Sequence, residues 1–216
     1  MTYLASRGSY LNSGGKYIDP QESIVIDGFN YPTDDIPNYY TGSLTSFETD
    51  SNFVREGSRS LKKFKDPNAH RITESDPGDG LNYYPQVGDT IYYETAISDG
   101  SKLAYFQFFR EHNQNNKDNY RFHLRENSVD LSSDLRNGGH KILAESSYSP
   151  IPDKYYTVVL DTSFISNGVR LDCYLFDGNN QKVYFRVDDT EYVHSGRALG
   201  WAVSGIGWYD NARVKK

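Results

Sequence analysis

The clearest evidence for the fold is the segment VRLDCYLF (169–176), which is followed by DGNN (177–180) and KVYFRV (182–187). Apolar and polar residues alternate along the first and third pieces, and a β-strand has this two-residue period because successive side chains point to opposite faces. The intervening Asp-Gly-Asn-Asn is a strong signal for a tight hairpin turn. The stretch therefore predicts two neighbouring antiparallel strands, each with one face turned toward a core.

Similar short segments follow one another along the chain and are separated by turn residues. We expect further strands at 24–29, 57–64, 89–98, 103–110, 120–125, 155–161, 198–203 and 207–214. No segment has a 3.6-residue apolar period over eleven or more residues, so helix should account for less than about a tenth of the chain. This pattern predicts an all-β protein built as an antiparallel two-sheet β-sandwich.

The pattern also divides the chain into two parts. Residues 1–24 are polar and rich in Gly, Ser and Tyr, which predicts an extended N-terminal arm, while residues 25–216 form the sandwich. Within the sandwich, residues 30–50 contain Pro32 and Pro37 and are expected to be a long ordered loop. Tyrosine recurs along the arm beside leucine or isoleucine, so we expect the arm to contact neighbouring subunits of a homo-oligomer.

Composition excludes several classes of partner. The chain holds 19 tyrosines against one methionine, and its formal charge is −6; tyrosine suits half-buried strands and surfaces that meet sugars or proteins. Lys62, Lys63 and Lys65 are too few to form a phosphate-binding surface, so no nucleic-acid partner is expected. No apolar run approaches the ~20 residues that cross a bilayer, so no membrane insertion is expected. Residues 1–8 contain no apolar core of signal-peptide length, so the ordinary secretory route is not expected if this is the complete gene product.

Several ordered motifs resemble one family of jelly rolls. They are VREGSRSL (54–61), YPQVGDT (84–90), YYTVVLD (155–161), LFDGNN (175–180), and the closing pair LGW (199–201) and GWYDNARV (207–214). Together they resemble the laminin-G-like, concanavalin A-like jelly rolls that are abundant in surface proteins and viruses of halophilic archaea. The resemblance covers residues 25–216 and implies a concanavalin A-like jelly-roll sandwich; it does not fix one function, since this fold carries many.

Strand alternation separates core residues from candidate binding residues. In 103–110, Leu103, Tyr105, Gln107 and Phe109 should share one face. In 120–125, Arg121, His123 and Arg125 should point outward together. Aromatic rings beside charged donors suit a glycan, so Tyr105, Arg121, His123 and Arg125 are the candidate glycan-binding residues; the alternative is a solvated outer face. The expected core includes Phe122, Leu124, Val158, Leu160, Leu171, Cys173 and Leu175.

Three further residues have both a functional and a structural interpretation. Cys173 is the only cysteine, which excludes an intramolecular disulfide and a thiolate metal cluster, and we expect a buried, inert thiol. Trp201 and Trp208 have the chemistry of sugar-stacking platforms, but their places in the closing strands favour the core.

Signatures of catalysis are missing from the sequence. The E-x-D-x-x-E pattern of sandwich hydrolases is absent, and Asp188, Asp189 and Glu191 lie in an expected turn region. The five histidines have no spacing typical of zinc or iron sites. We therefore expect no enzyme activity and no required cofactor. The resembling jelly rolls often bind calcium between their first and last strands, which implies a structural calcium ion at Asp27 and Asp210; the alternative for Asp210 is a hydrogen bond to a neighbouring turn.

The resemblance leads to two expected functions. The first is a non-enzymatic structural or adhesion protein on a virion surface, such as a turret, spike or tail fibre component of an archaeal tailed virus. In that case the arm attaches it to other virion proteins and the sandwich is free to bind host glycans. The alternative is a carbohydrate-binding module of a secreted or cell-surface protein.

Overall fold

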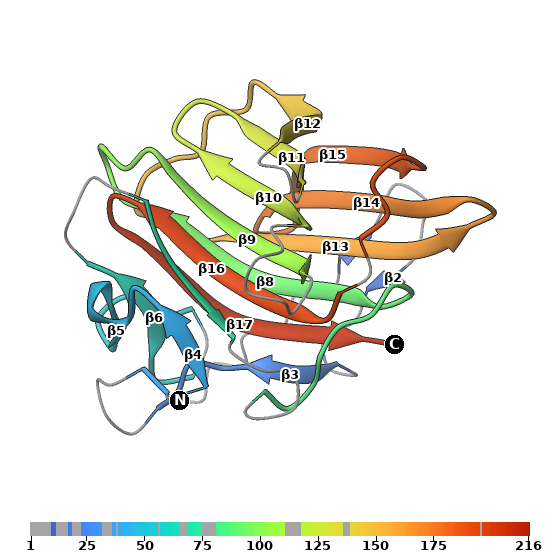
Figure 1. Ribbon diagram of the computed structural model, residues 1–216. Helices are drawn as coiled ribbons and strands as arrows, with labels where there is room; N and C mark the ends of the chain where they lie inside the picture. Colours follow the sequence, from blue (N-terminus) through green and yellow to red (C-terminus); the bar gives the residue numbers. More distant parts are fainter. Residues whose placement is uncertain are drawn as a thin grey trace.

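The computed structural model is a two-layer β-sandwich (Figure 1). It describes residues 10–11, 17–18, 23–31, 36–37, 39–55, 57–64, 69–74, 81–110, 118–135, 139–194 and 196–216. One sheet has seven strands, in the order β12 (His140–Ser146), β11 (Val129–Asp134), β10 (Asn119–Arg125), β9 (Leu103–Arg110), β16 (Ala198–Ser204), β7 (Ala69–Glu74) and β4 (Tyr40–Gly42).

The second sheet lies behind the first in Figure 1 and has eight strands. Seven follow the order β15 (Asn180–Asp189), β14 (Gly168–Asp177), β13 (Tyr156–Ile165), β8 (Thr90–Ile97), β17 (Gly207–Lys215), β6 (Ser60–Lys63) and β5 (Phe47–Asp50). The eighth, β3 (Ile24–Asp27), pairs with the last part of β17, beyond the part that pairs with β6. All pairs are antiparallel, and the described residues contain one short 3₁₀ turn, Leu44–Ser46, so the antiparallel sandwich predicted from the sequence is confirmed.

The hairpin that was predicted from residues 169–187 is present as β14 and β15. β14 and β15 pair from Val169 opposite Asp189 to Asp177 opposite Asn180. Gly178 in the connecting turn has a φ of +56°, which glycine adopts without strain and which the twisted turns of β-hairpins require.

The two sheets enclose one main hydrophobic core. All seven residues expected there are buried, namely Phe122, Leu124, Val158, Leu160, Leu171, Cys173 and Leu175. Burial raises the pKa of the Cys173 thiol well above its usual value, which agrees with an inert side chain. Trp201 also lies in this core and stacks on Phe106 at 4.5 Å between ring centroids.

Trp208 is buried on the other side of its sheet. Its neighbour Tyr209 belongs to the main core, so Trp208 must face outward by strand alternation. There it packs against Phe53 at 4.5 Å between centroids, and its Nε1 donates a hydrogen bond of 3.0 Å to Oδ2 of Asp50. The expected place in the core is therefore confirmed for Trp201, whereas Trp208 is buried outside the main core, under the segment that contains Phe53.

Two local expectations are wrong. Residues 30–50 include β4 and β5, where a long loop was expected; each strand is only three or four residues long and begins at an aromatic residue that is buried, Tyr40 or Phe47. Phe109 was expected on the same face as Tyr105 but packs with Phe108 in the core. Its φ of +51° and a register shift opposite β16 mark a β-bulge, which reverses the alternation at this point.

The beginning of the chain is described in part. β1 (Tyr10–Leu11) and β2 (Tyr17–Ile18) pair with each other as a separate two-stranded sheet. The rest of the expected arm, up to residue 22, lies outside the described residues. Among the residues that the structure describes, no helix is long and apolar enough to cross a membrane.

Candidate glycan-binding face

The four candidate residues lie together on the outer face of the seven-stranded sheet. Tyr105 of β9 is directly opposite His123 of β10, and their rings are 5.0 Å apart in an edge-to-face arrangement. The guanidinium carbon of Arg121 lies 4.9 Å from the centre of the Tyr105 ring. Arg125 follows on the same face of β10, so the sequence correctly predicted which side chains meet here.

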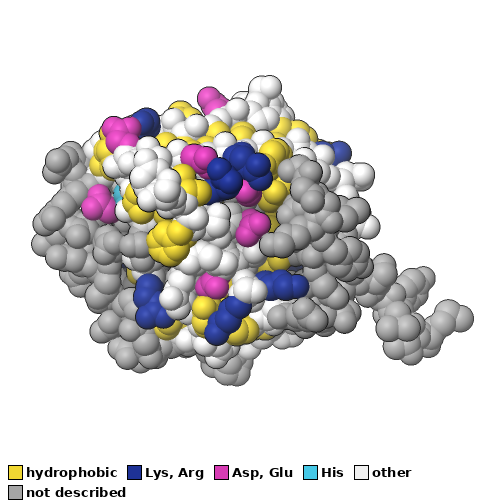
Figure 2. Space-filling model, turned by 90° about the vertical axis from the view of Figure 1, so that its right-hand side faces the viewer, with side chains coloured by type: hydrophobic (Ala, Val, Ile, Leu, Met, Phe, Trp, Pro, Cys, Tyr) yellow, Lys and Arg dark blue, Asp and Glu magenta, His cyan; other side chains and the backbone are white. Residues whose placement is uncertain are grey.

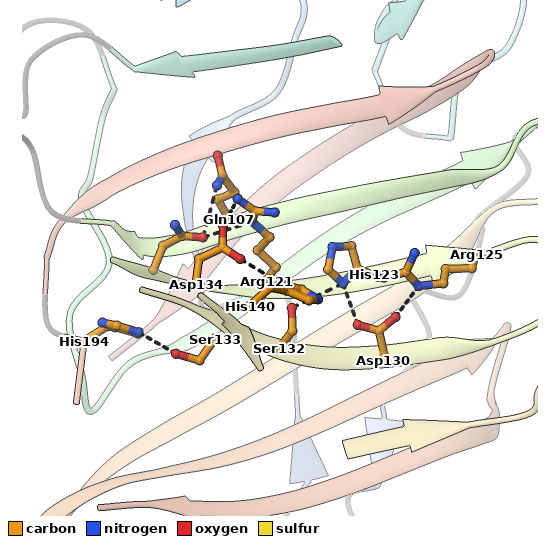
Figure 3. A network of polar contacts seen from close by, with 11 residues as sticks. Gln107, Arg121, His123, Arg125, Asp130, Ser132, Ser133, Asp134, His140 and His194 are labelled. Atoms are coloured by element: carbon orange, nitrogen blue, oxygen red, sulfur yellow. Dashed lines mark hydrogen bonds and ion pairs between the residues drawn. The ribbon is translucent and has the colours of Figure 1, made fainter. Parts of the chain in front are cut away.

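Asp130 of β11 holds the first part of a polar network on this face (Figure 3). Its Oδ1 is 2.6 Å from Nδ1 of His123, and its Oδ2 accepts a short hydrogen bond from Nε of Arg125. Burial alone would raise the pKa of this carboxyl, but hydrogen bonds from His123 and Arg125 outweigh it and lower the pKa. Asp130 is therefore held as an ionised acceptor between two donors.

Asp134 organises the second part of the network. It forms an ion pair with Arg121, and its Oδ1 lies 2.8 Å from Nδ1 of His140 on β12. Beside it, the Asn119 side-chain oxygen accepts hydrogen bonds from Gln107 at 3.0 Å and from Arg121 at 3.3 Å. Each guanidinium on this face is thus fixed by a carboxylate of the neighbouring strand, as Figure 3 shows.

This face is polar and yet largely shielded from water. His123 is 2% exposed and Asp130 is fully buried, as are Gln107, Asn119 and Ser132. Of the outward row Arg121, His123 and Arg125, His123 is therefore shielded from water, whereas a solvated outer face was the alternative. Tyr105, Arg121 and Arg125 lie half-buried above them and form the layer that a ligand would meet.

The ionisation of His123 follows from its burial. Burial lowers the pKa of His123 to about 4, although the neighbouring Asp130 acts in the opposite direction. Burial, followed by the charge of Arg121, also lowers the pKa of His140. At neutral pH both rings are uncharged, so two arginines face two aspartates and the network has a net charge close to zero.

The sequence did not reveal the carboxylate partners. Asp130 and Asp134 belong to β11, a strand that was not expected because Val129 is the only β-favouring residue in VDLSSD. The signal available was the short polar turn after Arg125, which returns the chain directly beside β10. Asp130 and Asp134 then face the same side as His123 because they alternate with the buried Val129 and Leu131.

The two residues expected to bind calcium have different surroundings. The Asp27 carboxylate accepts hydrogen bonds from the hydroxyl of Tyr40 (2.7 Å) and the amide of Phe29 (2.7 Å), and a short one from the hydroxyl of Tyr31. Oδ2 of Asp210 accepts a hydrogen bond of 2.7 Å from the amide of Arg55, and this contact matches the alternative that was expected for Asp210. Within the described ranges, no group of three or more His, Cys, Asp or Glu side chains is arranged to hold a metal ion. The calcium site stays a prediction.

The surface charge elsewhere is mixed. On the end of the sandwich that Figure 2 shows, Lys and Arg side chains are interspersed with Asp and Glu side chains. Among the exposed ion pairs of the sandwich is the one between Arg170 and Asp188, at 2.7 Å. The described residues of this end therefore form no patch of a single sign.

Comparison with known proteins supports the fold at low sequence identity. No protein-family model and no curated protein sequence matches the chain. Among solved structures, the chain is similar to the carbohydrate-binding module CBM66 from Bacillus subtilis, with a TM-score of 0.57 and 14% identity over 86% of this chain and 100% of that one. It is also similar to the catalytic domain of a glycoside hydrolase family 131 protein from Coprinopsis cinerea, with a TM-score of 0.54 and 14% identity over 89% and 94% of the two chains.

A third similar structure is the receptor binding domain of botulinum neurotoxin D. Here the TM-score is 0.52 and the identity 11%, over 89% of this chain and 48% of that one. None of these three proteins is named as a haloarchaeal or virion protein, so that part of the resemblance stays an expectation. What the similarities establish is the fold, an antiparallel two-sheet jelly-roll β-sandwich.

Proposed function

We propose that this protein is a carbohydrate-binding β-sandwich, and that the glycan lies on the outer face of the seven-stranded sheet. The observation that carries the proposal is the two-layer arrangement of that face. Tyr105, Arg121 and Arg125 are half-buried above a fully hydrogen-bonded layer that includes His123 and Asp130. A buried and satisfied network of this kind fixes the side chains above it before a ligand arrives.

The exposed layer has the donors that sugar hydroxyls require. A guanidinium carries five N–H donors in a planar fork, and Arg121 and Arg125 each direct some of theirs at a buried aspartate. The guanidinium of Arg125 and the phenol of Tyr105 lie half-buried on this face, where they can donate hydrogen bonds to a ligand above the sheet. Since the network beneath has a net charge close to zero, it favours an uncharged glycan over an acidic one.

The same network is unsuited to glycoside hydrolysis. That reaction needs one carboxylic acid that keeps its proton near neutral pH and a second carboxylate roughly 5–10 Å away. The pKa of Asp130 is lowered, mainly through hydrogen bonds from His123 and Arg125 that outweigh its burial. Asp134 is four residues farther along the same strand, a distance of about 13 Å between Cα atoms. We therefore propose binding without catalysis.

The location of the protein is a separate proposal. A glycan-binding module acts at an outer surface, and the chain fits either a secreted or cell-surface protein or the surface of a virion. The sequence resemblance to haloarchaeal surface and virus proteins motivates the second location. Neighbouring genes for capsid, portal or tail proteins would support the virion, and an upstream extension of the reading frame with an export signal would support the secreted or cell-surface protein.

A glycan array tests the proposed function. The full-length protein is applied to an array that contains both neutral and acidic glycans, at physiological salt. We expect binding to at least one neutral glycan above the signal of a heat-denatured sample. An array without any binding, or with binding to acidic glycans alone that salt abolishes, would contradict the proposal.

A further inference from the structure

The strand β15 forms one edge of the eight-stranded sheet, at the top of the rear sheet in Figure 1. In the part of the chain that the structure describes, β14 is the only strand that pairs with it. The backbone amides and carbonyls on its other side are therefore directed away from the sheet. An edge of this kind is a template for pairing with a further strand, so β15 is a candidate interface.

The side chains of β15 divide cleanly between the two faces of the sheet. Val183 and Phe185 belong to the main core. The residues that alternate with them, Tyr184, Arg186 and Asp188, therefore point to the outer face. The register shift between β14 and β15 lies before Val183, so residues 183–189 form a regular edge.

The edge of the other sheet is less suited to pairing. Its strand β12 has a register shift against β11 near its middle, between the partners of Leu131 and Ser132. A bulge at such a place bends an edge strand and is one of the devices that protect an edge from further pairing. Of these two edges, β15 is the one whose regular part is continuous.

The charged side chains on the outer face of β15 are exposed and yet held in place. Arg186 forms an ion pair with Asp172 of β14 at 2.8 Å. Asp188 accepts two hydrogen bonds of 2.7 Å from the guanidinium of Arg170. Lys182 is also exposed and lies on the same edge, ahead of the regular segment. The edge thus presents charges in a fixed order, two positive ones followed by a negative one.

This order of charges fits a second copy of the same strand. In an antiparallel pair centred on Phe185, Lys182 of each copy lies opposite Asp188 of the other, and Tyr184 lies opposite Arg186. Two-fold symmetry makes each contact twice. Opposite charges directly across a ladder stabilise it, and a guanidinium is attracted to the face of a tyrosine ring. On the inner face the two Phe185 side chains meet and continue the apolar layer.

Neighbouring registers are less favourable. A slip of one residue in one strand would place inner side chains opposite outer ones. A pair centred on Arg186 would set this arginine opposite itself, and a pair centred on Tyr184 would set it opposite Lys182. Like charges directly opposite destabilise a ladder. Centres beyond these positions shorten the regular segment that can pair. The sequence of β15 therefore favours the register centred on Phe185.

We propose that β15 pairs antiparallel with β15 of a second copy of this chain, centred on Phe185, so that the two eight-stranded sheets join into one. This contact differs from the one expected through the N-terminal arm. The two-fold axis of such a pair is perpendicular to the joined sheet, so both seven-stranded sheets lie on the same side of it. One consequence rests on the proposed function: the two glycan-binding faces are directed to one side, which favours surfaces that carry many glycans.

The oligomeric state of the full-length protein tests the proposal. Light scattering coupled to size exclusion, and sedimentation over protein concentrations up to the millimolar range, should show a monomer in equilibrium with a dimer. Lys182→Asp turns two attractive pairs into two repulsive ones, so it should weaken the dimer by roughly tenfold or more. Circular dichroism and the unfolding midpoint show that this variant keeps its fold.

A matched control has the same change of charge at a different place. Lys102 is exposed in the turn between β8 and β9, away from the edge formed by β15. Lys102→Asp changes the net charge of the protein by the same amount as Lys182→Asp does. It should leave the dimer as stable as that of the wild type, which separates the proposed contact from a general effect of charge.

Two cysteine variants test the register. Lys182→Cys and Asp188→Cys, mixed in equal amounts and mildly oxidised, should form a disulfide-linked dimer because the two positions lie directly opposite each other. In either variant alone the two new thiols are six residues apart along the ladder, about 20 Å, and should not form a link. The native Cys173 is buried and does not interfere.

Three results would overturn the proposal. The first is a wild-type protein that stays monomeric over the whole range of concentrations. The second is a dimer that Lys182→Asp weakens no more than Lys102→Asp does, because the contact would then lie elsewhere on the molecule. The third is a disulfide-linked dimer that forms equally well in the unmixed cysteine variants, because the strands would then pair in another register.

Discussion

His123 and Asp130 are directly opposite each other in the ladder between β10 and β11, and their side chains are joined by a hydrogen bond of 2.6 Å. The pair is buried on the outer face of a sheet, where polar residues usually meet water. The pKa of His123 is lowered to about 4, mainly by burial, and that of Asp130 is also lowered, by hydrogen bonds that outweigh its burial. The pair therefore consists of a neutral imidazole and an ionised carboxylate at neutral pH.

The first prediction concerns acid stability. The pKa of His123 is about 4 in the folded protein, below the roughly 6.5 of an unfolded chain. As the pH falls from 6.5 to 4 the unfolded state takes up the proton first, so the folded state loses stability across this range. The difference between the two pKa values corresponds to roughly 3 kcal/mol. Urea unfolding at pH 7 and pH 4.5 measures the loss.

A matched pair of variants isolates the contribution of His123. His123→Asn keeps a donor near Asp130 but does not titrate, so it should remove most of the loss between pH 7 and pH 4.5. His140→Asn is the control, because that side chain is 40% exposed and its pKa matters less for folding. An unchanged pH dependence in His123→Asn would contradict the assignment.

The second prediction concerns the core between the sheets. Leu160 and Leu171 are fully buried, and truncation of such residues leaves a cavity. Leu160→Ala and Leu171→Ala should each lower the free energy of unfolding by about 2–5 kcal/mol. Ile142 is 49% exposed, so Ile142→Ala should change the free energy of unfolding by less than about 0.5 kcal/mol. Thermal unfolding midpoints that are equal in all three variants would show that the strand faces are assigned wrongly.

The third prediction concerns calcium, which the sequence resemblance implies at Asp27 and Asp210. If the ion is present at a concentration about a hundred times its Kd, its removal lowers the free energy of unfolding by about 2.7 kcal/mol. The unfolding midpoint should then fall by about 5–10 °C in EDTA, and Asp210→Asn should abolish this difference. Asp188→Asn, at an exposed ion pair, is the control. An unfolding midpoint that EDTA leaves unchanged would contradict the predicted calcium site.

Most of the fold could be predicted because apolar alternation is strong where a strand is buried on one face. The segments 155–161, 169–176 and 182–187 have this pattern, and the structure places them side by side in β13, β14 and β15. The short strand β4 was missed because it contains few apolar residues, lies close to Pro37 and pairs with β7, which is distant in the sequence. The short strand β5 pairs with the nearby β6, but its four residues show no clear apolar alternation.

The candidate site could be predicted only in part. Alternation along β10 and β9 correctly brought Tyr105, Arg121, His123 and Arg125 to one face. It gave no information on Asp130 or Asp134, because their strand lacks an alternating apolar pattern over its full length. The alternation also predicted that His123 would be exposed to solvent. The side chain is instead buried by the carboxylates and arginines around it, and a local sequence pattern does not describe such neighbours.

The glycan site on the outer face of the seven-stranded sheet can be tested by isothermal titration. The wild-type protein and one variant are each titrated with a neutral glycan that the array has identified. Tyr105→Ala removes the ring that lies beside both Arg121 and His123, and it should weaken binding at least tenfold, equivalent to about 1.4 kcal/mol. The unfolding midpoint of the variant shows whether the fold is retained. Phe164 is strongly exposed and lies in the other sheet, so Phe164→Ala should bind the glycan as the wild type does. Binding that survives in Tyr105→Ala, or that is lost in Phe164→Ala, would contradict a glycan site on the outer face of the seven-stranded sheet.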